Sequence, residues 1–404
     1  SGSLQARHMK ILIISKSFPS SQFPSSGIFV KDFADTISLS NRIEILSPKP
    51  YTNKLLASFS PKWRDIGAIE PRTVAEKYSI RRPIYISLPR KILYKYAGYL
   101  YWIGIRRSFQ PTEYDLIHVN WLYPDGYIVP ILKVKYPKIP IVITIHGSDW
   151  YADNDNEKVN SLKGRSLFAA DLVLTVGDKL RTDILKVYPD LTHNVVSVPN
   201  GIRVDSLDPK SEMETVHFKK GIQKKLLMVG NYVKLKGHIF LFTALKNLRK
   251  NGYDFDLILV GNNLEPEYLK YLAAQIKFMG LADKVQFHVS LPRESLVHLY
   301  KNCDVFILPS LREGFGLSLI EALAFGKPVI STRSGGPEQI VNTINGLLVP
   351  PADSESLFEA LKAIMEDQVK FDARKIKAEA LGKYSYSNIV AEIEKLYNQI
   401  IESS

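Results

Sequence analysis

Short apolar runs alternate with helical patterns along nearly all of the 404 residues, and this alternation restricts the fold more than any other feature of the chain. The runs form two groups: 10–15, 42–47, 115–120, 140–147 and 172–177, then 225–230, 255–261, 285–290, 304–310 and 328–332. Because these runs are apolar at successive positions, they are typical of parallel strands buried on both faces, with helices as connections. The pattern predicts an α/β protein with two Rossmann-like, doubly wound domains in tandem.

A stretch rich in Pro, Gly, Asp and Ser, at 199–214, separates the two groups of runs. Such a composition is typical of a linker. It predicts an N-terminal domain over 10–200 and a C-terminal domain over 201–384, followed by a last helical pattern in 385–404. Residues 1–8 have the character of an expression scar and are left out of the fold prediction.

Composition is that of a globular protein, with 45% hydrophobic and 23% charged residues. No apolar run is long enough to span a bilayer, and no signal-peptide pattern opens the chain. The single cysteine, Cys303, cannot form a disulfide within the chain. We therefore expect a cytoplasmic protein, either free or peripheral at the inner face of the membrane.

The formal net charge of +12 is concentrated in the first half, where residues 1–200 hold 27 Lys and Arg against 17 Asp and Glu. Such a field attracts anionic lipid, nucleic acid or phosphorylated substrates and does not choose among them. The stretch 88–109 interleaves cations with aromatic rings: Arg90, Lys91, Lys95, Arg106 and Arg107 with Tyr94, Tyr96, Tyr99, Tyr101 and Trp102. This pattern indicates an amphipathic helix at an anionic membrane surface, or equally a helix whose rings fill the core; the charge favours the membrane.

Glu313 and Glu321 stand eight positions apart, after the run 304–310, and a glycine turn between them leads into an apolar helix. Both acids should therefore lie at the carboxyl edge of a parallel sheet, where open α/β folds bind ligands. A helix N-terminus offers free N–H groups to anions, and a carboxylate accepts hydrogen bonds from neighbouring hydroxyls. This combination suits a ligand that joins polyols to phosphate, as nucleotide sugars do.

The segment 311–332 resembles the EX7E signature of retaining glycosyltransferases of the GT-B fold, specifically glycosyltransferase family 4. Other matching segments follow the family's order: 27–34, 118–126, 143–150, 198–202, 226–237, 257–261 and 334–351. The resemblance implies two domains that face a cleft, with the helix in 385–404 packing back on the first domain. It also implies metal-independent transfer of a sugar from a nucleoside-diphosphate sugar to a glycan or lipid-linked acceptor, in polysaccharide or glycolipid synthesis. The donor is expected mostly on 226–346 and the acceptor mostly on 10–150.

By this resemblance, Glu321 holds the ribose hydroxyls, Glu313 holds the transferred sugar, and Lys236 neutralises the leaving diphosphate as a point charge. Further donor contacts are expected from the backbone amides of Phe315, Gly316 and Leu317, from Gly27 at the start of the first helix, and from His288 near the base. Plainer alternatives are a helix-start acid for Glu321, a solvated loop acid for Glu313 and a surface lysine for Lys236.

Asn231 departs from the family pattern, which has a phosphate-binding Arg at that position. The bidentate guanidinium contact is therefore missing. Lys234, Arg333 and Lys16 are the candidates to replace it.

The acceptor side is expected at the ends of two first-domain strands. His146, in the sequence HGSD, positions the transferred sugar by resemblance, although a histidine at a strand end is more often structural. Asn120 and Trp121, together with His118, close the neighbouring strand, where acceptor contacts are implied. Asp149 either orients the acceptor or His146, or caps the following helix.

No metal site and no cofactor are expected. Residues 153–155 and 254–256 have the spacing of a metal-binding Asp-x-Asp, but neither has the surroundings of such a site, so both are interpreted as solvated acids. The chain has no Cys/His cluster, Walker loop or GxGxxG, which removes support for zinc chemistry, ATP hydrolysis and hydride transfer.

Three other functions remain open. A nucleotide-sugar epimerase or a phosphorylase has the same two-domain architecture, and an epimerase would convert the donor without an acceptor. A soluble sugar or sugar-phosphate synthase of the same family would not need a membrane. A non-enzymatic basic module would bind nucleic acid with strong salt dependence, but the intact donor motif argues against nucleic acid as a partner.

Overall fold

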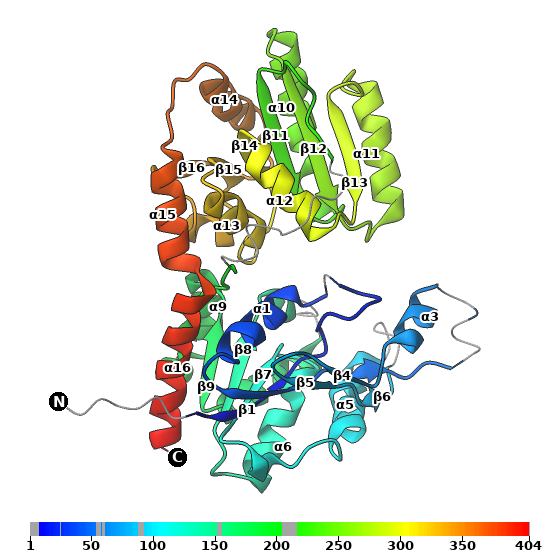
Figure 1. Cartoon of the computed structure of the whole chain (residues 1–404), viewed down its shortest axis with the longest axis vertical. Coiled ribbons are helices and arrows are strands. Elements are labelled where there is room, and N and C mark those ends of the chain that lie inside the picture. Colours follow the sequence, from blue (N-terminus) through cyan, green and yellow to red (C-terminus); the bar gives the residue numbers. More distant parts are fainter. Residues whose placement is uncertain are drawn as a thin grey trace, which may run out of the picture. The chain divides into compact units, whose positions relative to one another are not determined.

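The computed structural model describes residues 8–24, 26–53, 58, 61–87, 93–151, 156–203 and 216–403. The chain divides into two compact units (Figure 1): unit 1 is Ser1–Gly201 with Tyr386–Ser404, and unit 2 is Ile202–Ser385. The boundaries expected after residues 200 and 384 each lie one residue from this division. Most of the linker stretch, from 204 onward, and residues 1–7 of the expected scar lie outside the described residues.

Unit 1 is built on a sheet with the strand order β10-β9-β8-β7-β1-β2-β5-β4. The strands are β1 Lys10–Ile14, β2 Arg42–Leu46, β4 Arg72–Val74, β5 Ser79–Arg81, β7 Leu116–Asn120, β8 Ile141–Ile145, β9 Leu172–Thr175 and β10 Val195–Ser197. Neighbouring strands are parallel except β4, which pairs antiparallel with β5. β3 (Lys49–Pro50) and β6 (Ile84–Tyr85) form a separate parallel pair. β8 is buried at every position, as expected for a strand with both faces covered.

Helices cover the faces of this sheet, and the last helix of the chain is among them. The α-helices are α1 Ile28–Ile37, α3 Pro61–Ala68, α5 Ala97–Ile105, α6 Ile128–Lys135, α7 Ser148–Tyr151, α8 Glu157–Ala169, α9 Asp178–Val187 and α16 Tyr386–Glu402. α16, drawn in red, packs against α1 (Figure 1), where Phe33 and Ile37 share a core with Ile389 and Ile393. This burial of apolar side chains ties the end of the chain to its beginning.

Unit 2 has a parallel sheet with the order β13-β12-β11-β14-β15-β16. The strands are β11 Lys224–Val229, β12 Phe255–Gly261, β13 Val285–Val289, β14 Val305–Leu308, β15 Val329–Thr332 and β16 Gly346–Val349. The α-helices are α10 His238–Lys250, α11 Pro266–Phe278, α12 Arg293–Asn302, α13 Leu317–Ala324, α14 Ser354–Met365 and α15 Ala373–Tyr384. A second core lies in this unit, with Phe242 and Phe255 fully buried in it.

The predicted fold class is confirmed, since every predicted strand run contains a strand of the structure. The strands that were not predicted, β3, β4, β5, β6, β10 and β16, are short, and β4 and β5 make an antiparallel pair outside the repeating pattern. Strands this short carry too few apolar residues to stand out in a sequence.

The predicted helix over 88–109 is shorter in the structure. Residues 88–92 lie outside the described part, a 3₁₀ turn spans Tyr94–Tyr96, and α5 ends at Ile105. Tyr101 is buried, while Tyr96 and Tyr99 remain exposed, so some of the rings pack in the core and others lie at the surface. None of the helices in the described residues has the length and apolar character required to cross a membrane.

Candidate functional site

The sheet of unit 2 has a topological switch point between β11 and β14. From β11 the chain proceeds to β12 on one side, and from β14 it proceeds to β15 on the other side. The loops that follow these two strands therefore diverge and leave room for a ligand at the carboxyl edge. Lys236 and Glu313 come from these two loops, and the Lys236 Nζ lies 2.5 Å from the Glu313 Oε2. Their side chains are 21% and 13% exposed, so the pair is largely but not fully buried.

Close backbone contacts hold these loops in place. Gly237 has φ +70°, and an added Cβ there would lie 1.9 Å from the carbonyl oxygen of Pro309. An added Cβ at Gly336 would lie 2.4 Å from the Cα of Phe315. Only glycine allows both approaches. The amide of Gly336 also donates to the carbonyl of Glu313 at 2.8 Å, which joins the loop after β14 to the loop after β15.

The N-terminus of α13 presents free amides beside this pair. Within the described residues, no oxygen accepts a hydrogen bond from the backbone N–H of Phe315, Gly316 or Leu317. Oε1 of Glu313 likewise has no partner in that part of the chain, while Oε2 also accepts from Ser310 at 3.2 Å. The site thus combines an ammonium group, unpaired amides and a carboxylate oxygen able to accept hydrogen bonds.

Glu321 lies on α13, and both of its oxygens have protein partners that the sequence did not indicate. Arg293, at the start of α12, lies 2.5 Å from Oε1, and the hydroxyl of Tyr300 donates to Oε2 at 2.9 Å. Tyr300 is fully buried, and burial followed by the charge of Glu321 raises its pKa well above the usual value. Glu321 is therefore held in one orientation before any ligand binds. No motif marks Arg293 or Tyr300, because their partner is distant along the chain.

Asn231, at the position of the missing Arg, belongs to a row of polar groups across three strand ends. Asn262 Nδ2 donates to Asn231 Oδ1 at 3.1 Å, and Ser290 Oγ donates to Asn262 Oδ1 at 2.7 Å. These residues follow β11, β12 and β13, and Asn262 and Ser290 were not predicted. His288 lies on β13, half-buried, and its carbonyl accepts from the Tyr232 hydroxyl at 2.9 Å. Burial lowers the pKa of His288.

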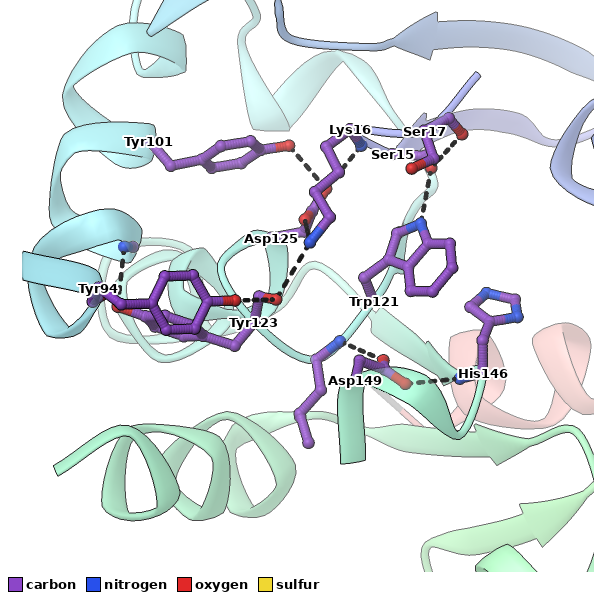
Figure 2. Close-up of polar contacts among 12 residues, drawn as sticks. Ser15, Lys16, Ser17, Tyr94, Tyr101, Trp121, Tyr123, Asp125, His146 and Asp149 are labelled. Atoms are coloured by element: carbon purple, nitrogen blue, oxygen red, sulfur yellow. Dashed lines mark hydrogen bonds and ion pairs between the residues drawn. The ribbon is translucent and has the colours of Figure 1, made fainter. Parts of the chain in front are cut away.

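Unit 1 has its own switch point, between β1 and β7, and Trp121 lies there (Figure 2). The indole nitrogen of Trp121 donates to Ser15 Oγ at 3.3 Å, which links the ends of the two strands. The ring centroid of His146 lies 4.6 Å from that of Trp121 and 4.7 Å from that of Phe29. Trp121 has φ +79°, an uncommon conformation for a non-glycine residue that often marks a functional site.

His146 and Asn120 are joined by a hydrogen bond of 3.0 Å between Nε2 and Oδ1. Because Oδ1 can only accept, Nε2 carries the proton and Nδ1 is left as an acceptor, buried and without a partner in the described residues. Burial, with a smaller effect of His118, lowers the pKa of His146 to about 3. His146 is therefore a neutral imidazole at pH 7.

Asp149 connects the loops after β7 and β8 (Figure 2). Its oxygens accept from the backbone N–H of Leu122 at 2.7 Å and of His146 at 3.0 Å, and the residue is buried. Of the roles predicted for Asp149, this geometry supports orientation of the His146 loop, since the carboxylate faces the protein's own amides.

Lys16, which follows β1, pairs with Asp125, a residue that the sequence did not indicate. The Lys16 amide donates to Asp125 Oδ1 at 2.7 Å, its Nζ lies 3.7 Å from Oδ2, and the Tyr101 hydroxyl donates to Oδ1 at 2.9 Å (Figure 2). Burial raises the pKa of Asp125 to about 6, and Lys16 opposes this rise. Because Asp125 is fully buried, its contacts serve to position Lys16. The Lys16 side chain itself remains 23% exposed.

Gly27 and His118, two other predicted residues of unit 1, have different roles from one another in the structure. Gly27 is the N-cap of α1, and no oxygen in the described chain accepts from its amide or that of Ile28. His118, expected among the acceptor contacts, is instead inside the core: Nε2 contacts Thr144 Oγ1 and Nδ1 contacts the Tyr397 hydroxyl, each at 2.6 Å. His118 therefore ties α16 to the sheet.

Only one of the two Asp-x-Asp sequences, 254–256, lies in the part of the chain that is described. Residues 153–155 lie outside it. Asp256 is fully buried, contrary to its interpretation as a solvated acid, and it accepts from the Lys219 amide and from Gln286 Nε2. Across the described residues, no group of three His, Cys, Asp or Glu side chains is placed to hold a metal ion.

Comparisons with known proteins show the family and the fold of the chain. Residues 210–387 match the family described as Glycosyl transferases group 1, and residues 59–206 match Glycosyltransferase Family 4. A D-inositol 3-phosphate glycosyltransferase of Corynebacterium jeikeium is 28% identical over 72% of this chain and 73% of its own.

Solved structures share the fold over nearly the whole chain. A sucrose-phosphate synthase of Thermosynechococcus elongatus aligns with a TM-score of 0.77 and 19% identity, over 98% of this chain and 100% of the other. The Anabaena protein HepE in complex with UDP-glucose aligns with a TM-score of 0.67 and 18% identity, over 97% and 100%. The two family matches together span both units, and the chain belongs to the glycosyltransferases of the GT-B fold, of the family 4 type.

Proposed function

We propose that the chain is a retaining glycosyltransferase that moves a sugar from a nucleoside-diphosphate sugar, bound by unit 2, to a hydroxyl of a glycan or lipid-linked acceptor, bound by unit 1. One observation carries the proposal: the Lys236–Glu313 pair lies at the switch point of the unit 2 sheet, beside the free amides of α13. The solved complex of HepE with UDP-glucose supports a donor of this class.

The positive groups of the site suit a diphosphate. Lys236 supplies a full charge, and the amides of Phe315, Gly316 and Leu317 point from a helix N-terminus, where the dipole favours anions. Preorganised donors of this kind stabilise the charge that develops as the diphosphate leaves. We propose that turnover does not require a divalent metal, because these groups supply the charge stabilisation.

The carboxylates suit the hydroxyl groups of the donor. Oε1 of Glu313 is a free acceptor, and Oε2 becomes available when the diphosphate draws Lys236 away. Glu321 keeps lone pairs beyond those used by Arg293 and Tyr300, so it can still accept from a ribose hydroxyl.

In the proposed reaction, the bond between the anomeric carbon and the diphosphate oxygen breaks while the acceptor oxygen bonds to the same face of the sugar. The acceptor proton passes to the departing diphosphate, so no separate base is needed. The protein contributes positioning and charge stabilisation. Because His146 is a neutral imidazole whose Nδ1 is free, it can accept a hydrogen bond from a sugar hydroxyl without taking up a proton at pH 7.

The acceptor side has the character of a carbohydrate site. Trp121, His146 and Phe29 present ring faces and edges beside the polar groups of Asn120 and Lys16. Rings pack on apolar faces of a ligand while neighbouring polar groups fix its orientation. The relatives named for D-inositol 3-phosphate and sucrose-phosphate support a polyol acceptor. Synthesis of a polysaccharide or glycolipid is the wider role that we propose.

Thermal unfolding with UDP-, GDP- and ADP-sugars tests donor binding, because a ligand that binds only the native state raises its stability. One of these donors should raise the midpoint in the wild type and less so in Lys236→Ala. With the matching acceptor, NMR of the product should show the donor's anomeric configuration, and turnover should persist in EDTA. An inverted product, or conversion of the donor without any acceptor, contradicts the proposal.

A further inference from the structure

α5 carries aromatic and basic side chains on the face that unit 1 does not bury. Gly98, Tyr101 and Ile105 pack inward. The outward residues Tyr99, Trp102, Ile103 and Arg106 follow the spacing that places side chains on one helix face. Tyr99 is 52% exposed and Ile103 is 40% exposed. These are large apolar groups that the protein itself leaves uncovered.

Cations gather at both ends of this face. At the N-terminal end, the ammonium groups of Lys95 and Lys158 lie 5.2 and 5.8 Å from the ring centroid of Tyr96. At the C-terminal end, Arg106 and Arg107 are exposed directly after the helix. The face therefore carries exposed rings between positive groups, and such groups suit the surface of an anionic membrane.

A pocket of about 360 Å³ opens at the C-terminal end of α5. Arg106, Arg107 and Lys135 line it together with the rings of Trp102 and Tyr136, and its lining contains no acid. None of the three cations forms an ion pair with a carboxylate in the described residues. Three uncompensated cations around one hollow attract an anion of several oxygens, such as a phosphate.

The pocket is separate from the transfer site. Residues 106–111 lead into β7 and Lys135 leads toward β8, so the pocket lies at the amino edge of the sheet. Trp121 and His146 follow the carboxyl ends of the same two strands. An anion in the pocket is therefore not the transferred sugar or its leaving group.

We propose that this pocket binds the phosphate of an anionic phospholipid headgroup, with the outward face of α5 lying at the bilayer surface. A free phosphate ion would need only the cations. The exposed rings and Ile103 beside the pocket have no use in binding a soluble ion, whereas they suit the boundary between headgroups and acyl chains. Residues 1–200 hold 27 Lys and Arg against 17 Asp and Glu, so this part of the chain has a net positive charge, as the pocket does.

Sedimentation with vesicles tests the proposal without any use of the transferase reaction. Wild-type protein should bind vesicles that contain phosphatidylglycerol and not vesicles of phosphatidylcholine alone, and binding should weaken as salt rises. Arg106→Gln with Arg107→Gln should lower the partition coefficient by about 30-fold. The matched control is Arg72→Gln with Lys77→Gln, which removes two exposed cations from the β4–β5 region and should bind nearly as the wild type does. Tyr99→Ser with Ile103→Ser should also weaken binding.

Thermal midpoints and donor turnover should be unchanged in the α5 and control variants, which separates a lipid-binding defect from misfolding and from failure of the proposed transfer. Equal loss in the control pair would overturn the proposal, since any surface charge would then suffice. Stabilisation by glycerol 3-phosphate without vesicle binding would identify a soluble phosphate site instead. Salt-sensitive binding of DNA in preference to vesicles would make nucleic acid the partner of this face.

Discussion

The ammonium group of Lys236 lies 2.5 Å from the Glu313 carboxylate, and this pair joins the loops after two neighbouring strands of unit 2. Each group compensates the other's charge while no donor is bound. A diphosphate is a stronger partner for the ammonium group, and hydroxyls are adequate partners for the carboxylate. In the proposed function, donor binding would therefore exchange one internal ion pair for two contacts with the ligand, at little electrostatic cost.

Lys236→Ala should remove most transfer and leave the fold intact. A hydrogen bond to a charged group contributes about 1.5–3 kcal/mol, which corresponds to a loss in kcat/KM of about 10- to 150-fold. Lys236→Arg is the matched control, because it keeps the charge and should retain more activity than the alanine variant. Steady-state kinetics with circular dichroism for the fold checks this, and near-normal turnover in Lys236→Ala would remove Lys236 from the mechanism.

Tyr300→Phe should loosen Glu321 while leaving its charge in place. The lost hydrogen bond from the buried hydroxyl should lower the free energy of unfolding of unit 2 by about 1.5–3 kcal/mol. Because Glu321 then loses a fixed orientation, KM for the donor should rise more than kcat falls. Tyr253→Phe, which removes an exposed hydrogen bond from the same unit, is the comparison. If the donor KM stays constant in Tyr300→Phe, Glu321 does not depend on this support.

The fold was predictable from sequence, and so was the position of Lys236, Glu313 and the α13 amides at one sheet edge, whereas the partners of Glu321 were not. Lys236, Glu313 and the amides of α13 follow apolar strand runs directly, so strand order alone brings them to one edge. Arg293 and Tyr300 reach Glu321 from a different helix, and that contact depends on how α12 packs on the sheet. A local pattern carries no information about such packing.

The difference between local pattern and long-range packing also explains what the sequence did not indicate in unit 1. Asp125 looks like an ordinary loop acid in the sequence, but the chain buries it under Tyr101 and Lys16. His118 lies two residues before Asn120, so the two side chains share one face of β7, and nothing local shows that α16 covers His118. Long-range packing decided the role of each residue.

Acid should destabilise unit 1 through its buried histidines. Burial lowers the pKa of His118 and of His146 to about 3. Above the unfolded value near 6.5 both states are neutral; as pH falls below it, the unfolded chain binds protons that the folded chain does not, so stability is lost progressively down to about pH 3. The loss at pH 5 is about 2 kcal/mol per histidine.

Asp125 opposes this effect only in part. Because burial raises its pKa to about 6, ionised Asp125 lowers the free energy of unfolding above that pH. Protonation of Asp125 restores about 1 kcal/mol of this free energy as pH falls from 7.5 to 5. The stability lost through the two histidines should therefore exceed the stability regained through Asp125, and the midpoint of thermal unfolding should fall across this pH range. This fall in the midpoint should be smaller in His118→Gln than in the wild type. In His193→Gln it should equal the wild-type fall, because His193 is exposed. An equal fall in all three proteins would assign the acid sensitivity to other groups.

Trp121 should act on the acceptor through its ring and on stability through its backbone. Trp121→Ala removes the ring contact, worth about 1 kcal/mol, and should raise the acceptor KM about fivefold, while Trp121→Phe should retain most binding. Because φ is +79°, Trp121→Gly should be more stable than Trp121→Ala by about 1 kcal/mol. Equal acceptor KM in the wild type and Trp121→Ala would place the acceptor elsewhere.

Asn231→Arg should strengthen donor binding. At present the Asn231 side chain accepts a hydrogen bond from Asn262. A guanidinium group at 231 would add a bidentate contact to the diphosphate, so the donor Kd should fall about tenfold or more. The lost Asn262 contact should cost about 1 kcal/mol of stability. Asn231→Gln changes the same contact without adding charge, so it should leave the donor Kd near the wild-type value. Calorimetric titration with the donor separates these outcomes; if Asn231→Arg binds the donor no more tightly, another group already occupies the place of the missing arginine.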